Sequence, residues 1–229
     1  MHTFNLSRLA SLAALCAALA ACSTTQPVPY SGLASSSKLQ ANERDSDGRV
    51  PYEYKSDTDW SRYAAFIVDP VVIYRGTDNQ FEDISDQDKK YLARYMQTQF
   101  TEKLSTRLKT SRAPADDTLR IKLTLTGAKA NTAFMSTFTR FDLVGGPYNA
   151  VQAARGKEGA MTGSVSFAVE IYDSSTNALL GAYVSKQYPN AWNLKAGMGA
   201  MSASEVGIQK GADQLITYCL LYTSDAADE

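Results

Sequence analysis

Histidine and cysteine are almost absent from this chain of 229 residues, which has one histidine and three cysteines. His2 and Cys16 lie in the first 21 residues, a leader that we expect to be removed, and Cys219 lies in a tail of doubtful origin. The remainder has no histidine and no thiol other than Cys22, which excludes Ser-His-Asp and Cys-His catalysis and zinc sites built on these residues. It also excludes a structural disulfide. We therefore expect no cofactor, no metal and no enzymatic activity, although catalysis by carboxylates alone stays open.

A surplus of either charge is also lacking. With Arg8 and the three acidic residues of positions 219–229 set aside, 22 basic and 21 acidic residues remain. Recognition of nucleic acid usually needs a concentrated basic face, so no nucleic-acid partner is expected.

Long apolar runs are scarce, and the one at the N-terminus is short. Arg8 is followed by an apolar run from Leu9 to Leu19, and small residues then precede a cysteine. This is the organisation of an export signal, and the run is too short for a bilayer core, which needs about 20 apolar residues. Leu19-Ala20-Ala21-Cys22 resembles the lipobox of bacterial lipoproteins, which implies cleavage after Ala21 and lipidation of Cys22. A simple cleaved signal followed by a chance cysteine is the alternative.

The residue after the cysteine bears on location. Ser23 stands where Gram-negative sorting reads aspartate as a signal for retention in the inner membrane. Its presence favours the outer membrane, where diacylglyceryl and acyl groups would hold the protein stably, at about 0.8 kcal/mol per buried CH₂. We expect a lipid-anchored protein of the outer membrane that faces the periplasm.

The chain divides into four predicted parts. These are a lipoprotein signal peptide (1–21), a tether and irregular N-terminal segment (22–59), an α+β periplasmic domain (60–218) and a tail (219–229). The tail resembles the translation of a sequencing adapter, which predicts a read-through artefact. A genuine helix end with a polar tail is the alternative, because Leu220 can continue a helical face.

The segment after the lipobox is poor in large apolar residues. Ser23 to Lys38 is rich in serine, threonine and proline, which predicts a flexible tether. Tyr30-Ser31-Gly32-Leu33 interrupts it, either as a turn with one apolar side chain or as a docking segment. Asn42 to Asp59 is polar and contains Gly48 and Pro51, so a loop is predicted.

The first strong element runs from Tyr63 to Tyr74, where β-branched and aromatic residues indicate a strand buried on both faces. Pro70 lacks an N–H group, so the strand lies at an edge or breaks there. Asp69 is the one charge in this run. It is either a site residue or a side chain that satisfies backbone donors at the break.

Two helices are predicted. One begins after the N-cap Ser85, and its apolar stripe comprises Leu92, Met96, Phe100, Leu104 and Leu108. The other begins at Ser202, with Glu205 completing a capping box. Gly207 and Gly211 would allow this helix to pack closely.

Three further strands follow from alternation. Thr118 to Thr126 alternates between apolar and polar residues, which predicts a half-buried strand with one wet face. Val165 to Ile171 repeats the pattern, and Leu179 to Tyr188 returns after a turn in which Asn177 can adopt the left-handed conformation. The predicted fold is α+β, a single mixed or antiparallel sheet of about four strands with two helices on one face, in the order β-α-β-β-β-α.

The connection from Ala128 to Met161 has no clear period. Phe134, Phe138 and Phe141 are spaced for one side of a helix, and Gly145-Gly146-Pro147 then stops any regular element. Long connections often carry function, so these aromatic residues are candidate binding residues. The connection can equally be a lid over the sheet edge.

Several short motifs resemble a family of bacterial lipoproteins catalogued as a domain of unknown function. The matching pieces are Tyr30-Ser31-Gly32-Leu33 with Lys38-Leu39, Trp60 with Tyr63, Asp69-Pro70-Val71 with Tyr74, and Glu170-Ile171-Tyr172-Asp173 ahead of Thr176 and Leu179-Leu180. The resemblance covers nearly all of the chain after the leader. Asn177 stands where the family pattern suggests glycine. Membership would imply the anchor and the fold but no catalytic residues.

Three functions compete. The first is a non-enzymatic binding or assembly module of the cell envelope with a protein partner, for which Asp69 and Tyr74 are further candidate binding residues. The second is a peptidoglycan or glycan binder that uses tyrosines with Trp60 and Trp192. The third is a hydrolase that pairs Asp69 with Glu170 or Asp173, for which the separation of the carboxyl groups is decisive.

Overall fold

The computed structural model describes residues 25–131, 151, 163–189 and 199–220. Its elements in chain order are the 3-10 helix η2 (Ser36–Lys38), β1 (Gln40–Ala41), β2 (Tyr52–Lys55), the 3-10 helix η3 (Trp60–Arg62), β3 (Ala65–Val68), β4 (Val72–Ile73), β5 (Gln80–Glu82), α2 (Asp86–Ser105), β6 (Lys109–Thr110), β7 (Thr118–Lys129), β8 (Ser164–Asp173), β9 (Leu179–Gln187) and α5 (Ser202–Leu220). Neither α2 nor α5 combines the length and the apolar character that a bilayer crossing requires, and the same holds for every other helix of the described residues.

The strands form one mixed sheet of nine strands. Seven of them follow the order β1-β2-β9-β8-β7-β3-β6, and β4 and β5 each pair with β7. The strands β2, β9, β8 and β7 are antiparallel neighbours, whereas β3, β4 and β5 all run parallel to β7 and follow one another along its edge. The prediction of about four strands is therefore wrong. The additional strands have two to four residues each, so they are too short to show a period and take their conformation from longer neighbours.

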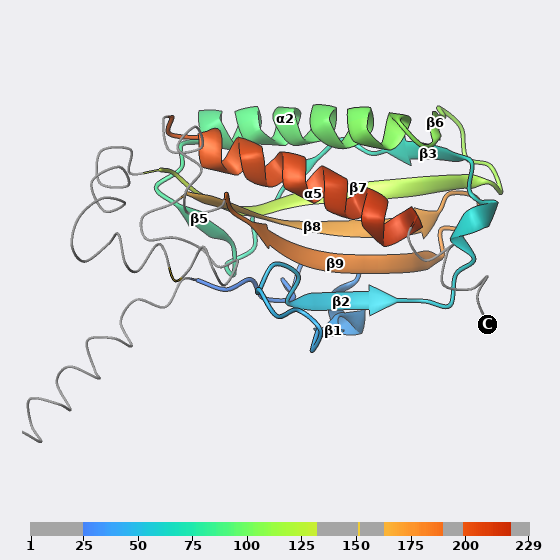
Figure 1. Cartoon of the computed structure of the whole chain (residues 1–229), viewed down its shortest axis with the longest axis horizontal. Coiled ribbons are helices and arrows are strands. Elements are labelled where there is room, and N and C mark those ends of the chain that lie inside the picture. The colour runs from blue at the N-terminus through green and yellow to red at the C-terminus, as the bar shows by residue number, and fades with distance from the viewer. Residues whose placement is uncertain (1–24, 132–150, 152–162, 190–198, 221–229) are drawn as a thin grey trace, which may run out of the picture.

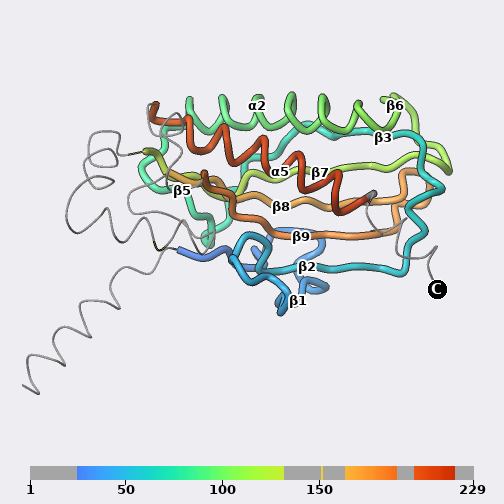
Figure 2. Tube along the Cα trace, viewed as in Figure 1, coloured from blue at the N-terminus to red at the C-terminus, as the bar shows by residue number. Residues whose placement is uncertain are grey.

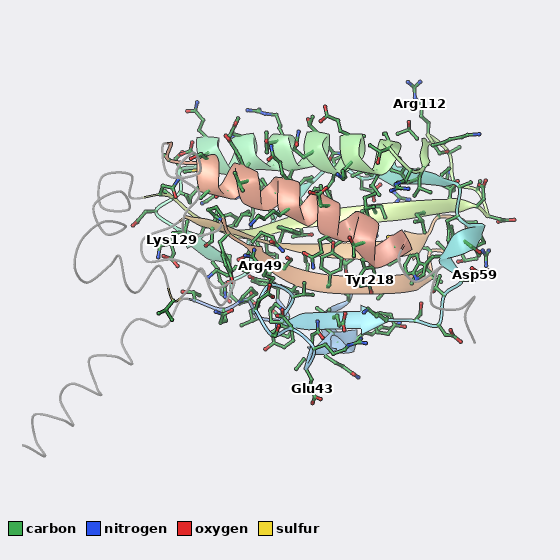
Figure 3. All side chains as sticks on the ribbon, viewed as in Figure 1. Glu43, Arg49, Asp59, Arg112, Lys129 and Tyr218 are labelled. Carbon is green, nitrogen blue, oxygen red and sulfur yellow. The ribbon has the colours of Figure 1, made fainter. Side chains whose placement is uncertain are left out.

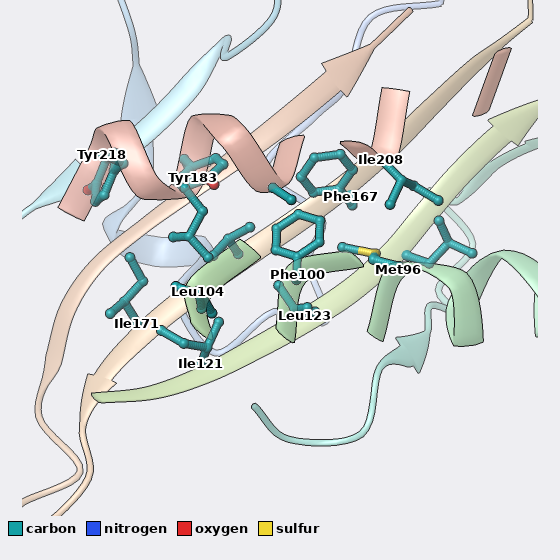
Figure 4. Close-up of a cluster of buried hydrophobic side chains, with 14 of the residues drawn as sticks. Met96, Phe100, Leu104, Ile121, Leu123, Phe167, Ile171, Tyr183, Ile208 and Tyr218 are labelled. Carbon is teal, nitrogen blue, oxygen red and sulfur yellow. The ribbon is translucent and has the colours of Figure 1, made fainter. Parts of the chain in front are cut away.

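The two long helices lie side by side over one face of the sheet, as Figure 1 shows. The main core lies between these helices and the sheet. In it the rings of Phe100 and Phe167 meet edge to face, with their centroids 5.6 Å apart (Figure 4). The stripe predicted for α2 supplies its share of this core, since Leu92, Met96, Phe100 and Leu104 are all buried.

The opposite face of the sheet carries a second cover, residues 25–39, which we call the strap. Tyr30 and Leu33 of the strap are buried against Ala168 of β8 and Val184 of β9. The prediction of a flexible tether is therefore wrong for the part of it that the structure describes, from Thr25 onwards. The error has a physical cause, because two large apolar side chains suffice to dock a segment that is otherwise polar.

The strap also corrects the prediction for β7. Its apolar residues face the helices as expected, but Thr118, Thr124 and Thr126 on the other side are buried too. Arg120 and Lys122 on that side are partly exposed. The alternation identified the two faces correctly, but the second face is not wet along the whole strand. A similar error concerns residues 42–59, where the predicted loop contains β2.

Local signals were more accurate. The strand predicted from Tyr63 to Tyr74 breaks at Asp69-Pro70 into β3 and β4, although the run is only partly buried and Val72 is exposed. The Ser85 hydroxyl accepts a hydrogen bond from the Asp88 N–H group and caps α2. Asn177 has φ 57°. These features depend on the covalent and hydrogen-bonding properties of single residues.

Candidate functional site

The strap is held at its centre by Tyr74, which follows β4. The Gly32 N–H group donates to the Tyr74 hydroxyl at 3.0 Å, and this hydroxyl donates to Asp78 Oδ1 at 2.7 Å. The second oxygen of Asp78 accepts from the Ser31 N–H group at 2.9 Å. The hydrogen bond from Tyr74, followed by that from Ser31, lowers the pKa of Asp78. Tyr74 is thus committed to holding the strap, and its hydroxyl is not free to bind a ligand.

Glycine is required at the point where the strap passes Tyr74. A Cβ atom added to Gly32 would lie 2.9 Å from Tyr74 Cε2. The ring of Tyr30 meets the ring of Tyr74 edge to face, with centroids 5.4 Å apart. The motif that contains Tyr30 and Gly32 therefore packs with Tyr74. It also forms a turn, in which the Leu33 N–H group donates to the Tyr30 carbonyl at 3.0 Å, so the segment is both a turn and docked on the sheet.

A second attachment joins the strap to β5. The buried Tyr30 hydroxyl donates to Gln80 Oε1 at 3.0 Å, and the Gln80 amide donates to the Gln26 carbonyl at 2.7 Å. Burial raises the pKa of Tyr30 to about 12. The phenol therefore stays neutral at physiological pH and acts as a donor here.

The strap is fixed from its first described residue. The Lys186 ammonium donates to the Thr25 carbonyl at 2.8 Å, and the Thr25 hydroxyl donates to Glu82 Oε1 at 3.3 Å. Glu82 also forms an ion pair with Lys129 at 3.3 Å. Since Thr25 is only three positions after Cys22 in the sequence, the described chain is already docked three positions after the predicted lipidation site.

The C-terminal half of the strap is held by Glu170, a buried residue of β8. Its Oε1 atom accepts from the Ser35 N–H group at 2.7 Å. Tyr172, two positions further along β8, has its pKa raised to about 12 by burial and by the charge of Glu170. The Lys122 ammonium lies 4.4 Å from the centre of the Tyr172 ring. Glu170, one of the carboxylates considered for hydrolysis, is therefore hydrogen-bonded to the backbone of the strap.

Asp69 forms an ion pair with Arg120 and not a carboxylate pair with Glu170 or Asp173. Both of its oxygens accept from Arg120 Nε, at 3.1 and 2.9 Å. Arg120 belongs to β7, the strand beside β3, so the ion pair joins two neighbouring strands. The sequence contained both residues but no local signal that pairs them across 51 positions.

Asp173 ends β8 and organises the turn that follows. Its oxygens accept from the N–H and hydroxyl groups of Ser175 and Thr176 and from the Tyr63 hydroxyl, which lies at 2.9 Å. Burial alone would raise the pKa of Asp173, but these hydrogen bonds outweigh it and hold the pKa well below its usual range. In turn, burial and then the bond to Asp173 raise the pKa of Tyr63 to about 12.

The three carboxylates lie in or directly after two strands that are not neighbours. Asp69 follows β3, whereas Glu170 and Asp173 lie in β8, and β7 runs between these two strands. Two strand spacings correspond to about 10 Å between backbones. None of the three residues lines the hollow along β1 and β2, the one beside α5 or the one beside the start of α2.

Trp60 is a core residue. Its ring lies 6.0 Å from the ring of Tyr218 and 6.5 Å from that of Tyr63, and it is buried. The remaining predicted site residues lie outside the described residues: Ala21, Cys22, Phe134, Phe138, Phe141 and Trp192. Cys219 is described; it is buried in the last turn of α5, where burial raises its pKa to about 12.

The described surface includes hollows along β1 and β2, beside α5 and beside the start of α2. One of about 630 Å³ lies along β1 and β2, one of about 460 Å³ lies between Asp45 to Val50 and α5, and one of about 160 Å³ lies beside the start of α2. Each is lined by side chains of both charges. Among the described residues, no group of three or more acidic, histidine or cysteine side chains is arranged to hold a metal ion.

Sequence reasoning missed several strap contacts, namely those of Gly32, Asp78, Gln80, Glu82 and Lys186. They join positions at least 42 residues apart, so no local pattern relates them. The one available signal was the family resemblance, which includes both the Tyr30 motif and Tyr74.

Comparisons with known proteins give a family and distant similarities. The family model DUF3313, described as a protein of unknown function, matches residues 29–215. No curated protein matches the chain. The PelC dodecamer from Paraburkholderia phytofirmans is similar at 9% identity over 65% of this chain and 86% of that chain, with a TM-score of 0.34.

Two other solved structures are similar at the same level. A PDZ domain protein from Parabacteroides distasonis has 12% identity over 72% of this chain and 34% of that chain, with a TM-score of 0.36. A protein of family DUF330 from Xanthomonas campestris has 6% identity over 73% of this chain and 89% of that chain, with a TM-score of 0.35. Likeness at this level carries no inference about function.

Proposed function

This chain belongs to DUF3313, a family of proteins of unknown function, and we propose that it is an acylated outer-membrane lipoprotein that serves the envelope as a non-enzymatic binding or assembly module. One observation carries the proposal. The lipobox-like sequence that ends at Cys22 is followed, three positions later, by a strap that is folded onto the domain from Thr25. A lipid on Cys22 would therefore hold a folded domain close to the membrane.

The engagement of the carboxylates supports a non-enzymatic role. Asp69 is paired with Arg120, Glu170 holds Ser35, and Asp173 holds a turn. Each carboxylate has an internal partner that a catalytic acid or base would have to release.

The edge of the sheet at β1 supports a protein partner. Gln40 and Ala41 are exposed, and no strand within the described residues pairs with the outer side of β1. An open edge offers backbone N–H and C=O groups to an added strand. The neighbouring hollow carries charges of both signs, since Glu53 pairs there with Arg44 and with Lys55.

The anchor is tested by two cysteine substitutions. In Cys22→Ala we expect no incorporated fatty acid and release from the outer-membrane fraction, because the acceptor sulfur is gone. Cys16→Ala is the matched control, since it removes a thiol from the apolar part of the leader and should leave both properties intact. Membrane fractionation and intact-mass spectrometry give the readouts. A Cys22→Ala protein that still fractionates with the outer membrane, together with a wild type that carries no fatty acid, would contradict the proposal.

The binding role is tested by site-specific photo-crosslinking in intact cells. A crosslinking residue at Ala41 probes the open edge, and one at Tyr91, which is 39% exposed on the helical side, is the control. We expect one dominant envelope protein to be captured from position 41 and not from position 91. Equal capture from both positions, or none from position 41, would count against a partner at this edge.

A further inference from the structure

The length of chain between the anchor and the fold limits where the membrane can lie. From Cys22 to Thr25 there are three peptide steps, which span at most about 11 Å when fully extended. If Cys22 is acylated, as the proposed function holds, its Cα atom must stay within that distance of Thr25, and the glycerol that it carries lies only the length of the thioether side chain beyond. The tether expected from sequence would instead have allowed the domain to move far from the lipid.

Thr25 lies at one end of the sheet. Figure 2 shows the first coloured part of the chain, in blue, entering at the end that carries β5. Its hydroxyl is bonded to Glu82 of β5, and Glu82 is paired with Lys129, the last residue of β7. Figure 3 shows Lys129 at this end of the molecule, whereas Asp59 and Arg112 lie at the opposite end.

The distance between the two ends is large compared with the linker. The strand β7 has 12 residues and runs between the two ends. Its first and last Cα atoms are separated by 11 steps of ~3.3 Å, a length of about 36 Å. A linker of about 11 Å therefore holds one end near the lipid and cannot bring Cys22 to the other.

The attachments of the strap keep Thr25 at this end. Thr25, Gln26, Tyr30 and Gly32 are each hydrogen-bonded to side chains of β5, β9 or the connection between β4 and β5. Peeling the strap away would expose the buried Tyr30 and break this series of bonds. The docked strap is thus the state that fixes the linker length.

We propose that the end of the sheet that carries Thr25, Glu82 and Lys129 rests on the phospholipid headgroups of the membrane that anchors the protein, and that the strap sets this orientation. The side chains of Glu82 and Lys129 are about half exposed, at 44% and 41%. A zwitterionic headgroup offers an ammonium to the carboxylate and a phosphate to the lysine. The exposed ion pair can therefore exchange partners with such a surface at little cost, because ion pairs in contact with water contribute little to stability.

The orientation is tested with two variants of the acylated protein that each gain one cysteine, Lys129→Cys and Arg112→Cys. Both positions carry an exposed basic side chain, and they lie at opposite ends. Labelling is selective, because the Cys22 sulfur is blocked by its lipid and the Cys219 thiol is buried with a pKa raised to about 12. The proteins are labelled with a fluorescent donor and reconstituted into phosphatidylethanolamine and phosphatidylglycerol vesicles that contain a headgroup-labelled acceptor.

We expect several-fold stronger energy transfer from position 129 than from position 112. Insertion of 20 Gly and Ser residues between Thr24 and Thr25 gives a flexible linker with a root-mean-square length of about 25 Å, and it should abolish most of this difference. Equal transfer from both positions without the insertion, or stronger transfer from position 112, would overturn the proposed orientation.

Flotation of the vesicles separates the two hypotheses. Protein that does not float with the vesicles would overturn acylation itself, and the orientation with it. Protein that floats but shows equal transfer would overturn only the orientation. A difference that persists unchanged after the insertion would show that the strap and its short linker do not set the orientation, and would overturn that part of the proposal.

Discussion

A single hydroxyl group joins two parts of this molecule that are distant in sequence. The Tyr74 hydroxyl accepts from the Gly32 N–H group and donates to Asp78, which in turn accepts from Ser31. Because the Tyr74 hydroxyl both accepts and donates a hydrogen bond, a side chain of the same size without a hydroxyl group cannot replace it. This makes Tyr74 the residue on which docking of the strap depends most directly.

Tyr74→Phe should reduce the free energy of unfolding by about 1–3 kcal/mol, because it leaves the Gly32 N–H group without its acceptor. Tyr91→Phe is the matched control, since Tyr91 also donates to a carboxylate, that of Glu205, but is 39% exposed. Its effect should stay within about 0.5 kcal/mol. Urea unfolding followed by circular dichroism gives both values. Equal effects of the two substitutions would show that the strap is not held by this hydroxyl.

Asp173 should make stability depend on pH in the acid range. Its pKa is held below the value of about 3.9 that it has in the unfolded chain. Its contribution is therefore fully present above pH ~4 and is lost as the pH falls below that value towards the pKa of the folded state. Asp173→Asn should cost about 2 kcal/mol at pH 7, and the difference from wild type should shrink progressively below pH ~4.

The exposed Asp57 provides the control for this substitution. Asp57→Asn should leave the free energy of unfolding at pH 7 unchanged. Urea unfolding at a series of pH values tests both variants. A constant difference between wild type and Asp173→Asn from pH 7 to pH 2 would refute the assigned role.

Residues whose effect is local could be predicted from sequence. Ser85 caps α2, Pro70 breaks the first strand and Asn177 has a positive φ. Each follows from the chemistry of one side chain and its immediate neighbours. Asp69 could not be assigned in the same way, because its partner Arg120 is 51 positions away and reaches it only through strand pairing.

Among the elements, α5 shows how closely a helix can approach the sheet. Gly207 lies over Val165, so that an added Cβ atom would be 2.7 Å from Val165 Cγ1, and one added to Gly211 would overlap the ring of Phe167. The absence of side chains at these two positions lets the helix backbone contact β8 directly. This is the close packing that the spacing of the two glycines predicted.

Gly211→Ala should therefore destabilise the protein, although the same change in an exposed helix usually stabilises it by about 0.5–1 kcal/mol. Overlap with the Phe167 ring should instead give a net loss of about 1–2 kcal/mol. Gly199→Ala is the control, since an added Cβ would be 3.5 Å from the nearest atom of Ser202. Thermal unfolding of both variants should show a lower midpoint for position 211 only, and a raised midpoint there would contradict the packing.

Elements with a sustained period were predicted, and short ones were not. The strands β7, β8 and β9 and the helices α2 and α5 have 9 to 20 residues each, enough for a periodic pattern. The strands β1, β2, β5 and β6 have two to four residues, and several of these residues are charged. Their conformation comes from pairing with longer strands, which no local pattern records.

At the scale of the whole molecule, the sheet lies between two unequal covers. The helices α2 and α5 cover one face, and the strap covers part of the other. Alternation in β7 showed that the strand has two faces, but it could not show what covers the second. A polar segment with two apolar side chains, Tyr30 and Leu33, does not resemble a core element until the hydrophobic surface that it meets is known.

Removal of the strap should destabilise the whole domain and cause it to associate. A chain that begins at Gln40 would expose Ala168 and Val184 on β8 and β9, and it would lose the burial of Tyr30 and Leu33, worth about 1.5–3 kcal/mol for each of the two large side chains. Exposed apolar surface of this kind promotes self-association. Compared with a chain that begins at Ser23, we expect a loss of several kcal/mol in urea unfolding and oligomers in size-exclusion chromatography with light scattering. A monomeric shortened chain of unchanged stability would show that the strap lies on the domain without contributing to its core. In that case the membrane linker would extend to Gln40, and the lipid could no longer fix the position of the domain.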